Sequence, residues 1–262
     1  MRSLAIAATG MAAQQLNTDV IANNIANINT TGFKRSRGEF TDLLYQADRP
    51  AGVAGRGPQD VIPQGTAVGL GVRTVSIRQL NIQGTLVNTG NKYDLALNGN
   101  GWFQVQGANN ETLYTRSGSF GLNAQGQLVT ADGSLVIPNI TIPNNATNVS
   151  ISETGKVSAN VNGSAAVTQL GQLTLASFVN DAGLAPLGGN LYRETPASGP
   201  QQIALAGDPG MGTIQQGYLE SSNVDPVKEI TDLIAAQRAY EMNSKVIQAA
   251  DDMYSTVTKG IR

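Results

Sequence analysis

The C-terminal segment of this chain carries two apolar stripes at helical spacing, and this pattern constrains the fold more than any other feature. The first stripe repeats every seven residues and comprises Leu233, Tyr240, Ile247, Tyr254 and Ile261. The second has gaps of three and four and comprises Ala239, Met242, Val246, Ala250, Met253 and Val257. Asp225 can cap such a helix, and Pro226 suits its first position. Two stripes about 100° apart predict a helix of roughly 50 Å with more than one neighbour.

The N-terminal segment shows a similar pattern over residues 3–29, which contain no Pro and only one Gly. One face comprises Leu4, Ala8, Met11, Ile21, Ile25 and Ile28, and a second comprises Ile6, Ala13, Leu16 and Val20. The helix, roughly 40 Å long, should end near Asn29, where Gly32 can adopt the left-handed C-terminal cap. A β domain that is joined to the two end helices only at their base cannot bury two apolar stripes on each helix. We therefore expect the helices to pack laterally against other copies in an open helical tube.

We therefore select candidate self-assembly residues from both helices. On the N-terminal helix they are Leu4, Ala8, Met11, Leu16, Val20, Ile21, Asn24, Ile25, Asn27 and Ile28. On the C-terminal helix they are Ile230, Leu233, Tyr240, Met242, Val246, Ile247, Met253, Tyr254, Val257 and Ile261. The amides of Asn23, Asn24, Asn27 and Asn29 have two interpretations, either buried groups that fix register between subunits or groups that face water.

The middle of the chain, residues 71–216, reads as β structure. Short alternating segments recur with turns between them, as in a sandwich or a barrel-like domain. Residues 93–97 and 102–106 flank Asn98-Gly99-Asn100-Gly101, which predicts a hairpin. Residues 46–70 are rich in Gly and Pro and read as an extended connector or long loop. The predicted organisation is mixed α and β: an N-terminal assembly helix and cap (1–45), the connector (46–70), a β-rich module (71–216) and a C-terminal assembly helix (217–262).

Composition argues against several classes of function. The chain has no Cys and no His, which removes disulfides, thiolate metal sites and the commonest general base. A net charge of −2 argues against non-specific nucleic-acid binding, and no apolar run is long enough for lipid insertion across a bilayer. We expect no enzyme activity, no cofactor and no metal. The helical pattern continues past Gln15, so we expect export without a cleaved signal peptide.

Four segments resemble the flagellar rod and hook proteins. They are LNTDVIANNIANINTTGFKRSRGEF (16–40), DLALNGNGWFQV (94–105), YTRSGSFGLNAQGQLVTADGSLV (114–136) and GYLESSNVDPVKEITDLIAAQRAYEMNSKVIQAADDM (217–253). They occur in the order that the family shows. Within that family, the length of 262 residues and the segment after Phe40 favour a distal-rod subunit over the longer hook subunits.

The resemblance implies a subunit of a rigid hollow drive shaft in the basal body of the bacterial flagellum. The end helices would form an inner, coiled-coil-like layer around an export channel, and the β module would form the outer wall. The implied partners are copies of the chain in a helical tube, proximal rod proteins, hook or hook-junction proteins and the surrounding bushing rings. The implied route is the flagellar type III export apparatus, and the implied location is the periplasmic space.

Several features have competing interpretations. The basic cluster of Lys34, Arg35 and Arg37 is interpreted as solvated or as forming intersubunit ion pairs rather than as a phosphate site. Trp102 is expected in the β core rather than in a ligand site. Another axial subunit, either proximal rod or hook, remains an alternative function. A secreted β-rich adhesin or glycan-binding module is an alternative of a different class.

Overall fold

The structure is a computed structural model that describes residues 2–49, 64–161 and 167–260. Its contacts divide the chain into two compact units. The first, here called the helical unit, comprises Met1–Ile25, Ser36–Arg78 and Pro226–Arg262. The second, here called the β unit, comprises Ala26–Arg35 and Gln79–Asp225. The mixed α and β fold class is confirmed, with a helix at each end of a β-rich middle.

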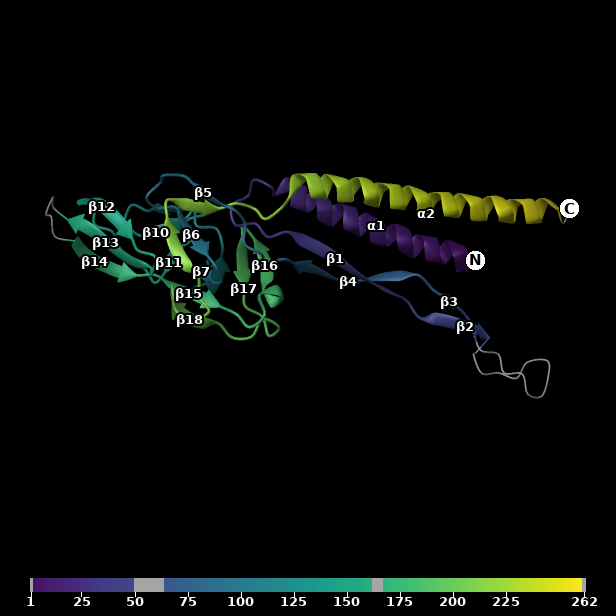
Figure 1. Ribbon diagram of the computed structural model, residues 1–262, viewed down its shortest axis with the longest axis horizontal. Helices are drawn as coiled ribbons and strands as arrows, with labels where there is room; N and C mark the ends of the chain where they lie inside the picture. Colours follow the sequence, from purple (N-terminus) through teal and green to yellow (C-terminus); the bar gives the residue numbers. More distant parts are fainter. Residues whose placement is uncertain (1, 50–63, 162–166, 261–262) are drawn as a thin grey trace. The chain divides into compact units, whose positions relative to one another are not determined.

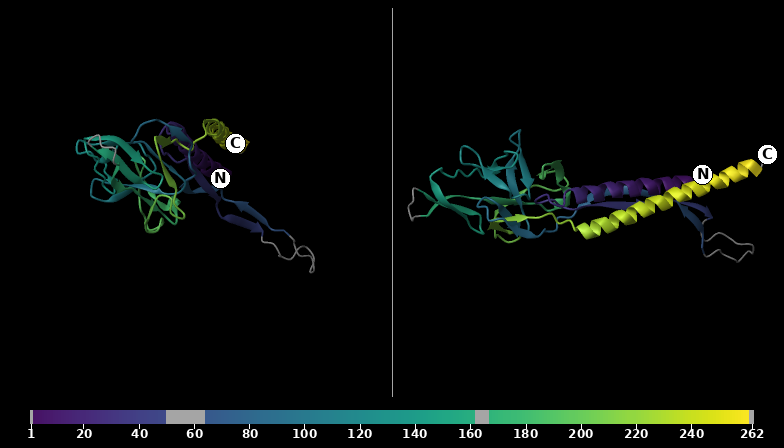
Figure 2. Two further views of the ribbon diagram at one scale, coloured as in Figure 1. Left: turned by 60° about the vertical axis from the view of Figure 1, so that its left-hand side comes forward. Right: turned by 90° about the horizontal axis from the view of Figure 1, so that it is seen from above.

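Two helices lie side by side in the helical unit (Figures 1 and 2). Helix α1 spans Arg2–Ala26 and helix α2 spans Pro226–Gly260. A Cβ atom added to Gly10 would lie 2.9 Å from Asn243 Nδ2, so the missing side chain lets the two helices approach closely. Pro226 is the first residue of α2, as expected. Helix α1 ends at Ala26, before the predicted end near Asn29, so Gly32 does not cap it: Gly32, with a φ of 71°, lies in the turn that follows the helix.

Two hairpin-like pairs of strands complete the helical unit. Strand β1 (Ser36–Asp42) pairs with β4 (Val72–Gln79), and β2 (Tyr45–Arg49) pairs with β3 (Thr66–Gly69). The backbone bond from Leu43 N to Gly71 O, at 2.8 Å, links the two ladders. The described parts of the predicted connector thus contain strands, and β4 pairs outside the predicted β module. Alternation identifies a strand but not the partner with which it pairs.

The β unit contains the remaining strands and one short 3₁₀ turn, η1 (Asp181–Gly183). The strands are β5 (Leu86–Asn88), β6 (Leu95–Asn98), β7 (Trp102–Gln106), β8 (Thr112–Thr115), β9 (Phe120–Leu122), β10 (Leu128–Thr130), β11 (Val136–Ile137), β12 (Ala146–Ile151), β13 (Lys156–Val161), β14 (Val167–Gln172), β15 (Thr174–Ser177), β16 (Ala185–Gly188), β17 (Leu191–Arg193), β18 (Gln202–Leu205), β19 (Thr213–Gln216) and β20 (Tyr218–Glu220). The largest sheet has the order β16-β17-β8-β7-β15-β18, with β11 also paired to β7.

The predicted hairpin at Asn98–Gly101 is wrong. Strand β6 pairs with β19, whereas β7 pairs with β8, β11 and β15, so the turn carries the chain from one sheet to another. Gly99 and Gly101 have φ values of 109° and 131°, which residues with a Cβ rarely adopt. The Asn-Gly sequence therefore marked a turn correctly but did not fix the pairing of the flanking strands.

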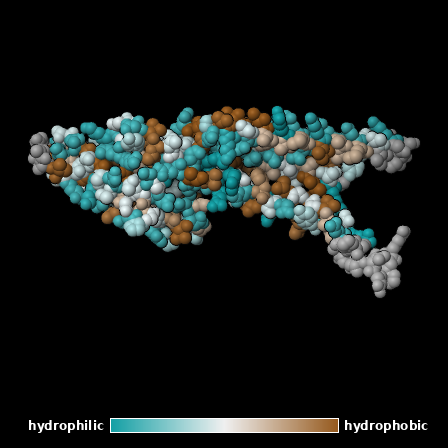
Figure 3. Space-filling view, viewed as in Figure 1, coloured by the Kyte–Doolittle hydropathy of each residue, from teal (hydrophilic) through white to brown (hydrophobic). Residues whose placement is uncertain are grey.

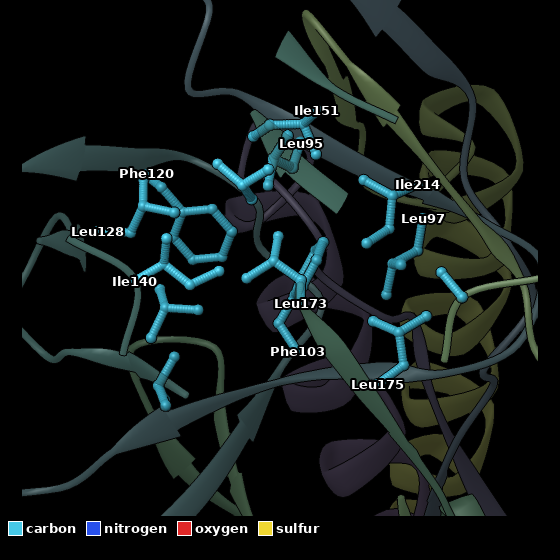
Figure 4. Packing of buried hydrophobic residues seen from close by; sticks show 14 of the residues in the cluster. Leu95, Leu97, Phe103, Phe120, Leu128, Ile140, Ile151, Leu173, Leu175 and Ile214 are labelled. Carbon is cyan, nitrogen blue, oxygen red and sulfur yellow. The ribbon is translucent and has the colours of Figure 1, made fainter. Parts of the chain in front are cut away.

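The core of the β unit is formed by aliphatic and aromatic side chains from most of its strands (Figure 4). Leu95, Leu97, Val105 and Leu175 are fully buried in it. A smaller cluster contains Trp102, which is 2% exposed and contacts the Tyr192 ring edge-on at 4.9 Å between centroids. Trp102 therefore occupies a core position, as expected.

We predict that two neighbouring glycines respond very differently to alanine. A Cβ at Gly118 would lie 1.5 Å from the backbone oxygen of Leu95, and relieving that clash requires strand β6 to move. A Cβ at Gly121 would meet nothing within 4 Å. Gly118→Ala should cost about 3 kcal/mol or more in the free energy of unfolding. Gly121→Ala should cost less than about 1 kcal/mol.

Urea denaturation followed by tryptophan fluorescence measures both variants, because the single Trp102 lies in this unit. Equal stabilities of the two variants would contradict the close packing at Gly118.

Candidate assembly surface

The face that α2 turns toward its own unit consists mostly of small or polar side chains. Ala236 and Ala250 are buried on α2, and Ala7 and Ala13 are buried on α1. Small side chains let two helices approach closely but bury little apolar area each. The larger apolar side chains of α2 therefore remain largely outside this contact.

Two patches of exposed apolar side chains lie on α2. The N-terminal patch comprises Val227, Ile230 and Ile234, of which Val227 is 74% exposed. The C-terminal patch comprises Met242, Val246 and Met253, and Met253 is 63% exposed. Figure 3 shows apolar surface gathered over the first turns of α2. Exposed apolar side chains grouped in this way are typical of a surface that another protein covers.

The predicted α2 residues divide into three groups. Leu233 and Ile247 are half-buried, whereas Tyr240 and Tyr254 are more exposed, at 43% each. Ile230 and the C-terminal patch are exposed. The side chains of Val257 and Ile261 lie outside the described residues. Sequence reasoning missed Val227 and Ile234, although their spacing of three and four from Ile230 is a helical stripe.

The predicted α1 residues lie mainly on the covered side of their helix. Val20, Ile21 and Asn24 are buried, and Ala8 is exposed. The other predicted positions are half-buried: Leu4, Met11, Leu16, Ile25, Asn27 and Ile28.

A shallow hollow of about 480 Å³ lies within the helical unit beside the C-terminal patch. Its lining comes from α1, α2 and the start of β4 and includes Ile6, Gly10, Val72, Asn243 and Val246. Val246 belongs both to this lining and to the C-terminal patch. The helical unit thus presents an apolar hollow next to exposed apolar side chains.

Asn24 fits neither interpretation of the asparagines, because it is buried but bonds within its own chain. Its side chain is fully buried, and its amide nitrogen donates to Ser36 O at 2.8 Å and to Glu229 Oε2 at 3.0 Å. Its amide oxygen accepts from Ser36 N at 2.9 Å. Asn24 therefore fixes α1 against β1 and α2 within one chain, whereas Asn23 and Asn29 are exposed and Asn27 is half-buried.

The interpretation of Lys34 as a solvated or intersubunit charge is wrong. Lys34 and Glu220 are both fully buried in the β unit, and Lys34 Nζ lies 2.5 Å from Glu220 Oε1. Lys34 Nζ also donates to Ile82 O at 2.9 Å, and Gly84 N donates to Glu220 Oε1 at 2.9 Å. A basic side chain in a polar sequence gives no sign of such burial, which depends on a partner 186 residues away. Arg37 behaves as expected, in an exposed pair with Glu39 at 3.0 Å.

Arg116 extends this buried ion pair. Its Nε lies 3.5 Å from Glu220 Oε2, and its two terminal nitrogens donate to Gly101 O at 2.7 Å and Gly99 O at 2.9 Å. Burial lowers the pKa of the Lys34 ammonium, and the charge of Glu220 opposes that shift. Burial likewise lowers the pKa of Arg116. The groups of this arrangement are buried and bond to one another and to backbone atoms, as in a structural network.

Within residues 2–49, 64–161 and 167–260, no helix is long and apolar enough to cross a membrane. In the same residues, no group of three Asp or Glu side chains is placed to hold a metal ion.

Comparison with known families identifies three matching segments. A model described as the flagellar hook protein FlgE/F/G D1 domain matches residues 96–159. A model of the flagellar basal body rod FlgEFG protein C-terminal region matches residues 215–259. A model described as flagella basal body rod protein matches residues 4–34. These matches define the class as flagellar axial proteins and cover most of both helices and part of the β unit.

Similarity to individual proteins covers the whole chain. The flagellar basal-body rod protein FlgG of Agrobacterium fabrum is 59% identical over 262 residues, which is all of both chains. The protein of the same name from Caulobacter vibrioides is 50% identical, with 99% of each chain covered. FlgF from the same organism is 38% identical, over 87% of this chain and 85% of its own length. The chain belongs to the FlgG family of flagellar basal-body rod proteins, which are structural proteins.

We predict that the buried ion pair is costly to break and much less costly to replace. Lys34→Met leaves Glu220 buried opposite an apolar side chain and should cost about 3–5 kcal/mol in the free energy of unfolding. Adding both Glu220→Met and Arg116→Met removes all three buried charges and should recover much of the loss, because no charge then remains buried without its partner. Glu39→Ala breaks only the exposed pair with Arg37 and should cost less than about 1 kcal/mol.

Urea denaturation of the three variants and the wild type measures these differences. A triple variant as unstable as the Lys34→Met single variant would contradict the prediction.

Proposed function

We propose that this chain is a subunit of the distal rod and polymerises into a rigid, hollow shaft that transmits torque to the hook. The observation that carries the proposal is the pair of exposed apolar patches on α2. The similarity to FlgG proteins over the full chain supports the assignment to the rod rather than to another axial part. The end helices would form an inner, coiled-coil-like layer around the export channel.

The distribution of apolar surface supports an open polymer rather than a closed dimer. The N-terminal patch and the hollow share no residue and are different surfaces of one helical unit. Contacts between unlike surfaces repeat from copy to copy, and they generate a helical filament when the rotation does not close a ring. The patches on α2 would be covered by neighbouring copies, and the side chains of Val246 and Met253 would leave water on assembly.

The wider setting follows from the same proposal. The chain would leave the cytoplasm through the flagellar type III export apparatus without a cleaved signal peptide and would assemble in the periplasmic space. Proximal rod proteins and hook or hook-junction proteins would flank it along the axis, and bushing rings would surround it. The mechanical role needs no catalytic residue, cofactor or metal.

The test is electron microscopy of the purified full-length chain beside variants of the C-terminal patch. Full-length protein should form straight hollow tubes, and a chain lacking residues 1–30 and 228–262 should remain monomeric. Val246→Lys and Met253→Lys should also prevent tubes, because a charge would be buried at each contact. Both variants should keep the fold of the monomer, since these side chains are already exposed.

Gln248→Lys is the matched control, since it adds the same charge at an exposed polar position of the same helix. Tubes of normal appearance from Met253→Lys would count against the assigned contact surface. Failure of full-length protein to form tubes, even when seeded with isolated rods, would count against the rod assignment.

A further inference from the structure

The chain passes between the helical unit and the β unit four times. The crossings lie after Ile25, Arg35, Arg78 and Asp225. Any force that passes from one unit to the other along the chain must use these four connections. On the β-unit side, the last three crossings adjoin the segments 32–35, 79–84 and 220–225. These three segments are bonded to one another inside the β unit.

One side chain joins all three segments. The Asn223 amide oxygen accepts a hydrogen bond from Arg35 N at 2.7 Å. Its amide nitrogen donates to Leu80 O at 2.8 Å and to Ile82 O at 2.9 Å. Leu80 N also donates to Arg35 O at 2.9 Å, so the segments are linked by backbone as well.

The buried ion pair adds a second layer of links between the same segments. Lys34 belongs to the first segment, Ile82 and Gly84 to the second, and Glu220 to the third. Lys34 bonds to both Ile82 O and Glu220, and Glu220 accepts from Gly84 N. In addition, Gly32 N donates to Glu220 O at 2.8 Å. Two independent sets of bonds therefore connect three of the four crossings.

We propose that Asn223 and the Lys34–Glu220 pair form a clamp that makes the three connecting segments respond to force as one body. The inference rests on the proposed function, since it assigns the clamp to torque transmission in the shaft. Separate segments would act as independent tethers, each free to bend and open locally. Cross-linked segments must open together, which stiffens the connection. Asn223 is thus a positioning residue whose effect lies in the mechanics of the polymer.

The chain provides a closely matched control in Gln216. Its amide oxygen accepts from Ile151 N at 3.0 Å, and its amide nitrogen donates to Lys92 O at 2.8 Å and to Val149 O at 3.1 Å. Asn223 and Gln216 therefore make the same pattern of one accepted and two donated bonds, and both are half-buried. Of the two, only Asn223 bonds to the connecting segments.

The first test is hydrogen–deuterium exchange on the full-length monomer, which does not depend on polymerisation. Asn223→Ala should speed exchange of the Arg35 and Leu80 amides by about tenfold, because the bonds that close this junction are lost. Gln216→Ala should leave these two amides unchanged and speed exchange at Ile151. Unchanged exchange at both Arg35 and Leu80 in Asn223→Ala would overturn the clamp.

The second test is the persistence length of tubes, measured by electron microscopy for the wild type and both variants. Both variants should lose a similar amount of free energy of unfolding, measured by urea denaturation. Tubes of Asn223→Ala should nevertheless have a clearly shorter persistence length than tubes of Gln216→Ala. Equal stiffness of the two variants would overturn the mechanical role, since a purely stabilising residue would affect both alike. If the wild type forms no tubes, the proposed function has failed, and the exchange experiment still decides whether the clamp exists.

Discussion

The meeting of residues 32–35 with residues 220–223 is the contact on which the rest of the structure depends. Lys34 and Glu220 are 186 residues apart, and both are fully buried. Placing two charges away from water is unfavourable unless they have partners. Here Lys34 also bonds to Ile82 O, Glu220 Oε1 accepts from Gly84 N, and Glu220 Oε2 has only the longer ion pair with Arg116, at 3.5 Å. The β unit is therefore complete only when two segments far apart in the sequence, 32–35 and 220–223, are both in place.

A second constraint concerns what each helix can cover. Helix α2 faces its own unit with alanines and polar groups, so its large apolar side chains find little cover within one chain. A monomer with Val227 and Met253 largely exposed would gain stability by association. Under the proposed function, the same helices that connect to the β unit would supply the surface for assembly, which suits a shaft whose subunits must bind neighbours and transmit force through themselves.

The sequence predicted the elements far better than their partners. Helical spacing and the Pro at position 226 located both helices to within a few residues, whereas the predicted cap, Gly32, lies six residues beyond the end of α1 at Ala26. Alternation identified many strands, but the pairing of β4 with β1 and the separation of β6 from β7 depend on contacts that no local pattern encodes. Among the candidate assembly residues, Ile230, Met242, Val246 and Met253 are exposed in the structure, and their place in a contact between subunits stays a prediction.

The polar residues were the least predictable part. Asn24 and Lys34 look alike in the sequence to neighbouring Asn and Arg residues that remain at the surface. Their burial is determined by partners on distant segments, Glu229 for Asn24 and Glu220 for Lys34. Asn223 likewise lies in a short loop before α2, and only the fold shows that it bonds to two other segments. The burial and hydrogen-bond partners of such polar residues depend on tertiary structure, so the periodicity of the sequence does not predict them.

Thiol labelling tests the central claim most directly, because the natural chain contains no Cys. A single Cys would be placed at Val246 or Met253, and its labelling rate would be measured in the monomer and in assembled tubes. We predict that the introduced Cys is labelled rapidly in the monomer and much more slowly in the tube, since neighbouring copies would cover both positions. Equally rapid labelling in both states would contradict the claim that the exposed face of α2 is the assembly surface.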